Sequence, residues 1–366
     1  MTRRTFIGGG LSAAVCGCRA WTHDDHYSVA LLGDTHFDGR APDVYHSGWI
    51  PRDERDREDR AREFKRNAEM WESRLPSLIA SAAAVRRDDT AFVLHMGDLI
   101  QGDTASAEMQ FRMLCDAERA CRKGMEDLPF HVACGNHDIR NGGAAGFDRY
   151  RNQSTCLLPY GPDAFLFIDF MRPDPDLIER LLSESDGARH VFVVSHGLLS
   201  PHDGWGYYWF LFGKKADSEV RRHFRHAFAK RNVIALCGHI HRTALMDWRL
   251  PEGRITQFAA NSVWTDRNQG NGVVEISSPA QFGTYVAAHP APMGEEHDGC
   301  HQNRTPDESR ALVDEYRDGL VRYRVVRAAG HYLLRVGDAV SVAFFPGDSR
   351  VPLETLTLRS RNLDRS

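Results

Sequence analysis

Five short apolar stretches recur along the first two thirds of the chain, and each is rich in β-branched or aromatic residues. They are YSVALLG (27–33), AFVLHMG (91–97), FHVACG (130–135), HVFVVS (190–195) and VIALCG (233–238). Unbroken apolar runs of this length are typical of strands that are buried on both faces. The pattern therefore predicts five strands in the interior of one domain.

Helical patterns lie between these stretches. The clearest has apolar residues in a three-four spacing, at Ala61, Phe64, Ala68, Trp71 and Leu75. This spacing predicts an apolar helix face, and oppositely charged residues four positions apart predict a solvated face on the other side. Further helices are expected around 106–124, 175–184 and 217–230. The alternation of strands and helices predicts an α/β fold.

After about residue 243 the pattern changes to strands and turns. The strand-like segments are TALMDWRL, RITQFAANSVW, YRVVRA, HYLLRV and AVSVAFF, and a polar helical insertion is expected near 290–320. We expect a main domain over 27–265 and a C-terminal β-rich extension over 266–366. The pattern leaves open whether this extension is a separate module or part of a second sheet.

The N-terminal segment, residues 1–20, has the order of an export signal. Arg3 and Arg4 precede a short apolar stretch, as in a twin-arginine signal, and Cys18 loosely resembles a lipoprotein processing site. We expect an exported protein that is periplasmic or tethered to a membrane, with a lipid anchor at Cys18 as one alternative. If the arginine pair is coincidental, the protein is cytoplasmic. No segment has the ~20 apolar residues of a transmembrane helix.

Composition narrows the class of protein. With 42% hydrophobic and 26% charged residues over 366 positions, the chain is neither disordered nor a multispanning membrane protein. The 46 Lys and Arg are balanced by 50 Asp and Glu, so a nucleic-acid scaffold is not expected. The count of 18 His is the unusual value, and composition alone does not say whether they cluster.

Metal-ligating residue types follow each of the five predicted strands. The strand ends read Gly33-Asp34-Thr35-His36, Gly97-Asp98, Gly135-Asn136-His137-Asp138, Ser195-His196 and Gly238-His239-Ile240-His241. Since ligands of open α/β sheets bind beyond the carboxyl ends of strands, these side chains are expected to meet at one edge. Seven oxygen and nitrogen ligands suit two divalent ions sharing a carboxylate, and this mixture favours Mn, Fe, Zn or Co. The alternative, ordinary turn formers and core histidines, requires coincidence at five strand ends.

The order of these motifs, GD-x-H, GD, GNHD, H and GH-x-H, resembles the calcineurin-like metallophosphoesterase superfamily over about residues 27–265. The resemblance implies a four-layer α/β/β/α sandwich with two central mixed sheets, followed here by the β-rich extension. It implies that Asp98 bridges two metal ions. The remaining ligands implied are Asp34, His36 and His241 for one ion and Asn136, His196 and His239 for the other.

The same resemblance implies a reaction. A hydroxide or water that bridges the metals attacks phosphorus, and His137 contacts the phosphate and helps to protonate the leaving oxygen. Asp138 is expected to orient His137. Gln101 stands where purple acid phosphatases carry a tyrosine ligand, so an iron–tyrosinate centre is not expected.

The sequence gives fewer signals for the residues of the substrate pocket. Arg242, directly after the last ligand, and His202 and Trp205, in the aromatic loop 197–213, are candidates for substrate contacts. A loop that packs over the sheet edge is the alternative for the aromatic segment. The cluster of His297, Cys300 and His301 fits no standard zinc spacing and is left without a role.

The sequence thus predicts a dinuclear metal-dependent hydrolase whose substrate is a phosphate mono- or diester. One alternative is a hydrolase of pyrophosphate-type bonds at the same centre. Another is a catalytically silent metal-binding scaffold that serves in protein interactions.

Overall fold

The computed structural model describes residues 25–38, 50–200, 218–263, 273–288, 314–326 and 328–360. Several predictions fall outside these residues and stay predictions. They concern the export signal over 1–20 with Cys18, most of the polar insertion near 290–320, and His202, Trp205, His297, Cys300 and His301.

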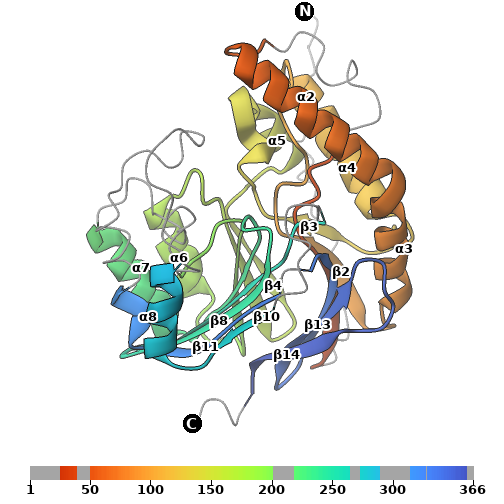
Figure 1. Ribbon diagram of the computed structural model, residues 1–366. Coiled ribbons are helices and arrows are strands. Elements are labelled where there is room, and N and C mark those ends of the chain that lie inside the picture. The colour runs from red at the N-terminus through yellow and green to blue at the C-terminus, as the bar shows by residue number, and fades with distance from the viewer. Residues whose placement is uncertain are drawn as a thin grey trace, which may run out of the picture.

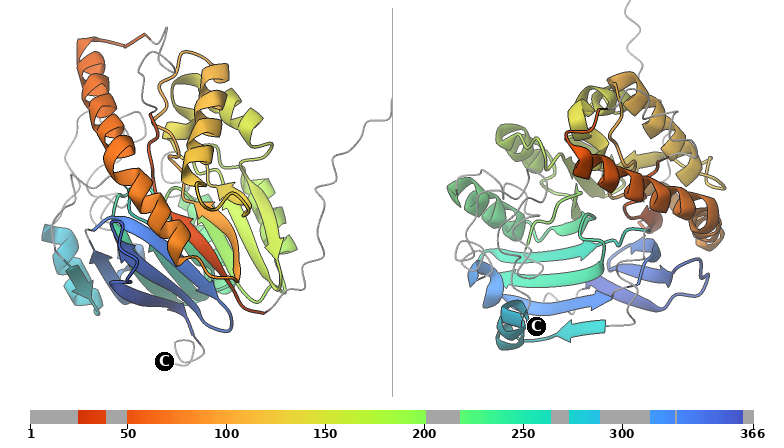
Figure 2. Two further views of the ribbon diagram at one scale, coloured as in Figure 1. Left: turned by 90° about the vertical axis from the view of Figure 1, so that its right-hand side faces the viewer. Right: turned by 45° about the horizontal axis from the view of Figure 1, so that its top comes forward.

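Two mixed sheets form the centre of the molecule (Figures 1 and 2). In the first, the described strands run in the order β14 (Glu354–Arg359), β13 (Val340–Pro346), β12 (Gly330–Val336), β1 (Tyr27–Leu32), β2 (Thr90–His95) and β3 (Phe130–Val132). In the second, the order is β10 (Val273–Ile276), β11 (Leu320–Val326), β8 (Thr243–Leu250), β9 (Gly253–Ala259), β7 (Ile234–Cys237), β6 (Val191–Ser195), β5 (Asp163–Ile168) and β4 (Cys156–Tyr160). The five predicted strands are confirmed as β1, β2, β3, β6 and β7, and the β4–β5 hairpin is an addition.

Helices cover the outer faces of both sheets (Figures 1 and 2). On the side of the first sheet lie α2 (Glu54–Glu69), the π-helical turn η1 (Met70–Arg74), α3 (Leu75–Val85) and α4 (Ala107–Cys121). On the side of the second lie α6 (Pro175–Glu184), α7 (Ser218–Lys230) and α8 (Pro279–Ala288). The short helices η2 (His137–Gly142) and α5 (Ala144–Tyr150) follow β3. No helix among the described residues is both long and apolar enough to cross a bilayer.

Three hydrophobic cores separate the four layers, and β1 shows how the sequence builds them. Because side chains alternate along a strand, Val29 and Leu31 enter the core between the sheets, whereas Ala30 and Leu32 enter the core beneath α3 and α4. A third core packs the second sheet against α6, α7 and α8. The predicted four-layer α/β/β/α sandwich is confirmed.

The C-terminal strands take part in both sheets. Strand β12 pairs antiparallel with β1, and β11 pairs antiparallel with β8. The boundary at residue 265 stays a prediction, but strands on either side of it share sheets. The extension therefore completes the central layers instead of folding apart from them.

Candidate metal centre

The predicted ligands converge because the strands before them are parallel neighbours. Strand β2 lies parallel between β1 and β3, and β6 pairs parallel with β7. Loops from the first sheet are bound together, since the Asp98 carbonyl accepts hydrogen bonds from the Thr35 and His36 N–H groups at 3.1 and 2.9 Å. The sheets are joined at the same edge, where the Val263 N–H donates to the Asp34 carbonyl at 3.0 Å.

Four of the seven predicted ligands have a left-handed backbone. The φ angles are 45° at His36, 47° at Asp98, 72° at His239 and 48° at His241. This conformation is unfavourable for residues other than glycine by roughly 1–2 kcal/mol each. Such strain clusters where a site needs a particular side-chain direction, and here it turns the side chains back over the strand ends.

Two groups of side chains meet at this edge. In the first, the His241 Nε2 atom lies 3.2 Å from both the Asp34 Oδ2 atom and the His36 Nε2 atom. In the second, the His196 Nε2 atom lies 3.1 Å from Asp98 Oδ2 and 3.0 Å from His239 Nδ1.

The Asp98 carboxylate lies between the groups, with its Oδ2 atom 3.8 Å from His36 Nε2. Within each group the ligand atoms all lie within 4.8 Å of one another. Each group could therefore hold one metal ion.

Two buried oxygen atoms support a cation at this edge. Asp34 Oδ1 and Asn136 Oδ1 receive no hydrogen bond from the described residues. A buried acceptor without a donor costs roughly 1–3 kcal/mol, and a bound cation removes that cost. Both atoms belong to predicted ligands, so this donor set fits divalent metals.

Burial and the charges within the cluster together set its protonation. Burial alone would lower the pKa of His196, but Asp98 and Asp34 raise it to about 9. Burial and repulsion between the imidazoles keep the pKa values of His36 and His239 well below the ordinary value. Neutral imidazole is the form that binds metals, so His36 and His239 are already in it.

Glycines before the ligands keep this space open. A Cβ atom on Gly238 would lie 2.4 Å from Asp34 Oδ1 and 3.1 Å from His196 Nδ1. A Cβ atom on Gly97, whose φ is +91°, would lie 2.7 Å from His196 Nδ1. Space therefore requires glycine at both positions, and at Gly97 the left-handed backbone requires it as well.

Replacing Gly238 by alanine is expected to weaken metal binding by about 10–100-fold, the usual effect of disturbing groups behind a ligand. The new methyl group overlaps Asp34 and displaces His196. It should also lower the free energy of unfolding of the metal-free protein by about 1–3 kcal/mol. Metal titration and thermal unfolding would measure both. The control is Gly283→Ala on α8, where a Cβ atom makes only ordinary contacts; equal effects of the two changes would contradict the steric argument.

His137 lies beside the cluster, and its ring packs edge-on against His36 with 4.7 Å between centroids. Its Nδ1 atom is 2.9 Å from the Gln101 carbonyl oxygen and 3.2 Å from Arg140 Nη1. A carbonyl can only accept and a guanidinium can only donate, so Nδ1 cannot bond to both. We assign the ring proton to Nδ1 on the shorter contact, so that it donates to Gln101. Nε2 is therefore the ring nitrogen left for the site.

The expected role of Asp138 is wrong. Its carboxylate accepts hydrogen bonds from the N–H groups of Gly135 at 2.9 Å and Ile100 at 3.1 Å, away from His137. Consecutive side chains of the 3₁₀-helix η2 point about 120° apart, so the two residues cannot face the same partner. Burial, followed by repulsion from Asp98, raises the pKa of Asp138 to about 7. The Asp138 carboxylate instead links the loop after β2 to the loop after β3.

Three residues at this edge were not predicted from the sequence. Arg140 contacts His137, and its position one 3₁₀ turn later was the available signal. Gln101 was noted only as a missing ligand. The Phe170 ring lies 5.5 Å from both His196 and His239, but it follows a hairpin that was not predicted. Arg242 is half-buried directly after His241, and its substrate role stays a prediction.

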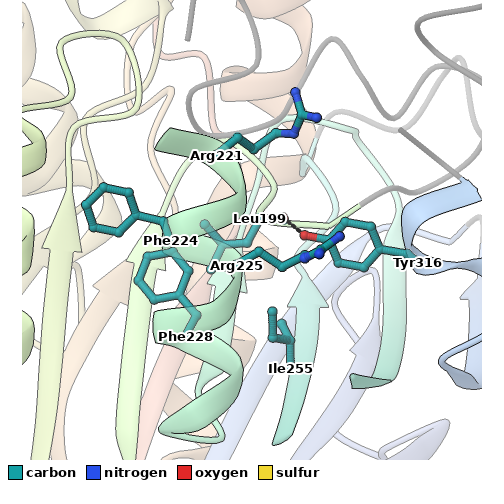
Figure 3. A pocket seen from close by; sticks show the side chains of 7 residues that line it. All are labelled: Leu199, Arg221, Phe224, Arg225, Phe228, Ile255 and Tyr316. Atoms are coloured by element: carbon teal, nitrogen blue, oxygen red, sulfur yellow. Dashed lines mark hydrogen bonds between the residues drawn. The ribbon is translucent and has the colours of Figure 1, made fainter. Parts of the chain in front are cut away.

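A small cavity beside α7 contains none of the predicted ligands (Figure 3). Its lining residues are Leu199, Arg221, Phe224, Arg225, Phe228, Ile255 and Tyr316. The two arginines share the Glu315 carboxylate at 3.0 and 3.2 Å, and the Tyr316 hydroxyl donates to the Leu199 carbonyl at 3.3 Å. The tyrosine bond fastens the segment after His196, and the arginine bonds join α7 to Glu315, so these contacts have a structural role.

A model of the calcineurin-like phosphoesterase family matches residues 27–243, the span that holds all five ligand-bearing strand ends. The chain belongs to this family. The resemblance of its motifs to calcineurin-like phosphoesterases is confirmed. A search of curated protein sequences finds no match.

Solved structures share this calcineurin-like phosphoesterase fold. One is purple acid phosphatase PPD1 from yellow lupin (Lupinus luteus) seeds, with 14% identity and a TM-score of 0.51. The match covers 93% of this chain but only 55% of the lupin protein. Another is PhoD, with 10% identity and a TM-score of 0.53 over 91% of this chain and 68% of PhoD. At these identities the likeness establishes the fold alone.

Proposed function

We propose that this protein is a dinuclear metal-dependent hydrolase of phosphate mono- or diesters. The observation that carries the proposal is the place of Asp98. Its carboxylate lies between two groups of ligand atoms, one with Asp34, His36 and His241 and the other with His196 and His239. A shared carboxylate between two sets of mixed ligands suits a pair of ions.

The predicted ligands would be divided between two metal ions. Asp34, His36 and His241 would hold one divalent ion, Asn136, His196 and His239 the other, and Asp98 both. Mn, Fe, Zn or Co would suit these ligands, and a bound pair would activate water and neutralise charge on the phosphoryl group. The chain itself directs the ligands: left-handed backbone turns four of the seven side chains over the strand ends, and glycines leave room beside Asp34 and His196.

His137 would supply the proton. The Gln101 carbonyl engages the Nδ1–H group, so in the doubly protonated ring the Nε2–H group would give its proton to the oxygen of the leaving group and leave the ring neutral. The ring stays next to His36, at the rim of the first ligand group. This places a general acid beside the centre without making it a ligand.

The test is metal analysis together with hydrolysis. Purified protein should bind about two transition-metal ions and cleave p-nitrophenyl phosphate or its bis-ester, and chelation should abolish the activity. Relative rates on the two esters separate monoesterase from diesterase. Activity on pyrophosphate alone would favour the pyrophosphate alternative. Protein loaded with both ions but inert on a broad ester panel would contradict the proposal and favour the scaffold.

A further inference from the structure

Helix α2 buries polar side chains where the sequence predicts an apolar face. Its fully buried residues are Arg60 and Asn67, whereas Ala61, expected on the apolar face, is exposed. Arg60, Glu63 and Asn67 are spaced three and four residues apart, so they lie along one face of the helix. We call these three residues the polar stripe. Burial of charged and amide groups is costly unless they are hydrogen-bonded, so the buried residues of the polar stripe need hydrogen-bond partners.

Those partners are the loops that carry predicted metal ligands. Arg60 donates to both carboxylate oxygens of Asp38, two residues after His36. Asn67 Nδ2 donates to Asp38 Oδ2 at 3.0 Å and to Gln101 Oε1 at 3.2 Å. Gln101 Nε2 donates to Glu63 Oε2 at 2.7 Å. The stripe therefore fastens the loop after β1 and the loop after β2.

The π-helical turn η1 continues this attachment. It places the Trp71 ring so that Nε1 donates to the Thr35 carbonyl at 3.1 Å, between the predicted ligands Asp34 and His36. The same ring meets Phe37 edge-on with 4.5 Å between centroids. A π-helical turn inside a helix is rare and is frequent at functional sites.

Gln101 connects the stripe to His137. Its side chain is held by Asn67 and Glu63, and its main-chain N–H donates to the Phe37 carbonyl at 2.9 Å. Because its side chain and its main-chain N–H are both hydrogen-bonded, the Gln101 carbonyl has a fixed position. That carbonyl accepts the hydrogen bond from His137 Nδ1 at 2.9 Å. Helix α2 thus reaches His137 through one buried side chain, which is only 3% exposed.

We propose that Gln101 and Asn67 are positioning residues, through which α2 holds the His137 ring in the orientation that proton donation requires. This inference rests on the proposed function. It assigns Gln101, which is no ligand, a part in the reaction through its side-chain bonds to Glu63 and Asn67. Disturbing those bonds should reorient His137 while leaving the predicted ligands in place.

The experiment uses a charge exchange within one hydrogen bond. Gln101→Glu places a carboxylate against Glu63 and is expected to lower kcat by about 10–100-fold, with two metals retained. The double variant E63Q/Q101E restores a donor to the acceptor and the original net charge. It should return kcat to within about threefold of the parent protein. Gln153→Glu, at an exposed position, adds the same charge elsewhere on the chain and should leave kcat unchanged.

The leaving group separates positioning from general damage. p-Nitrophenolate departs without much help, whereas phenolate is the anion of a weaker acid, phenol, with a pKa of about 10, and needs a proton to leave. If His137 is misplaced, Q101E should lose more activity on phenyl phosphate than on p-nitrophenyl phosphate. Equal losses on both esters, loss of metal, or failure of the double variant to recover would overturn the inference.

Two further measurements keep the outcome decisive. Asn67→Ala removes the second bond to Gln101 and should shift the same ratio of rates; if Q101E unfolds, N67A alone carries the test. The parent protein must first hydrolyse the phenyl and p-nitrophenyl esters, used as monoesters or, for a diesterase, as the corresponding diesters. A parent inert on the monoesters and the diesters contradicts the proposed function, whereas an active parent with an unchanged rate ratio in both variants contradicts only the positioning role.

Discussion

Replacing Asp98 by asparagine should lower kcat/KM toward phosphate esters by about 10³-fold and bring the bound metal below two ions per chain. The change preserves volume but removes the charge that two metals would share, a loss of several kcal/mol. Asp98 is 1% exposed, and its Oδ2 atom lies 3.1 Å from His196 and 3.8 Å from His36. Its Oδ1 atom accepts from the His137 N–H at 2.8 Å, a bond that the asparagine oxygen can keep.

Elemental analysis and steady-state kinetics on the same sample would measure this effect. Asp116→Asn on α4 removes a carboxylate that pairs with Arg119 on the same helix and is not among the predicted ligands, so it should change neither quantity. If the Asp98 variant retained two tightly bound ions and most of its activity, the bridging role would be wrong. Partial recovery of activity at high metal concentration would instead agree with it, because mass action compensates for weaker binding.

Replacing His137 by alanine should reduce kcat by about 10²–10⁴-fold, the usual contribution of a general acid. Metal content should stay at about two ions, because the predicted ligand set does not include His137. The loss should be greater for phenyl phosphate than for p-nitrophenyl phosphate, whose leaving group needs less protonation.

A different result for His137→Ala would contradict its role as a general acid. The His137 ring can form a third group of ligand atoms with His36 and Asp98. Loss of metal in step with activity would therefore make His137 a ligand and not an acid. His226→Ala, on the exposed side of α7, is the matched control and should leave both metal content and kcat unchanged.

The ligand-bearing strands were predictable because two local signals coincide there. An unbroken apolar run marks each buried strand, and a glycine beside a ligand type marks its end. The β4–β5 hairpin gave a weaker signal. Pro159 lies within β4, which is tolerated because β4 is the edge strand of its sheet.

The errors at the site come from contacts that residue type does not reveal. Arginine and asparagine on a helix usually face water, yet Arg60 and Asn67 are buried because loops distant in sequence provide partners. Asp138 follows His137 directly, and only the 3₁₀ geometry shows that their side chains diverge. Both cases depend on where the chain lies in space, which spacing along the sequence does not encode.

The pairing of β1 with β12 sets an order for biosynthesis. Tyr27 pairs with Val336 and Leu31 with Tyr332, so the strand leading to Asp34 and His36 obtains its second neighbour from near the opposite end of the chain. While the ribosome is still translating the middle of the protein, β1 has an open edge that can pair with another nascent chain. A metal site that depends on β1 would therefore be complete only after residue 336 has left the ribosome, and a chain that terminates earlier would leave the sheet unfinished.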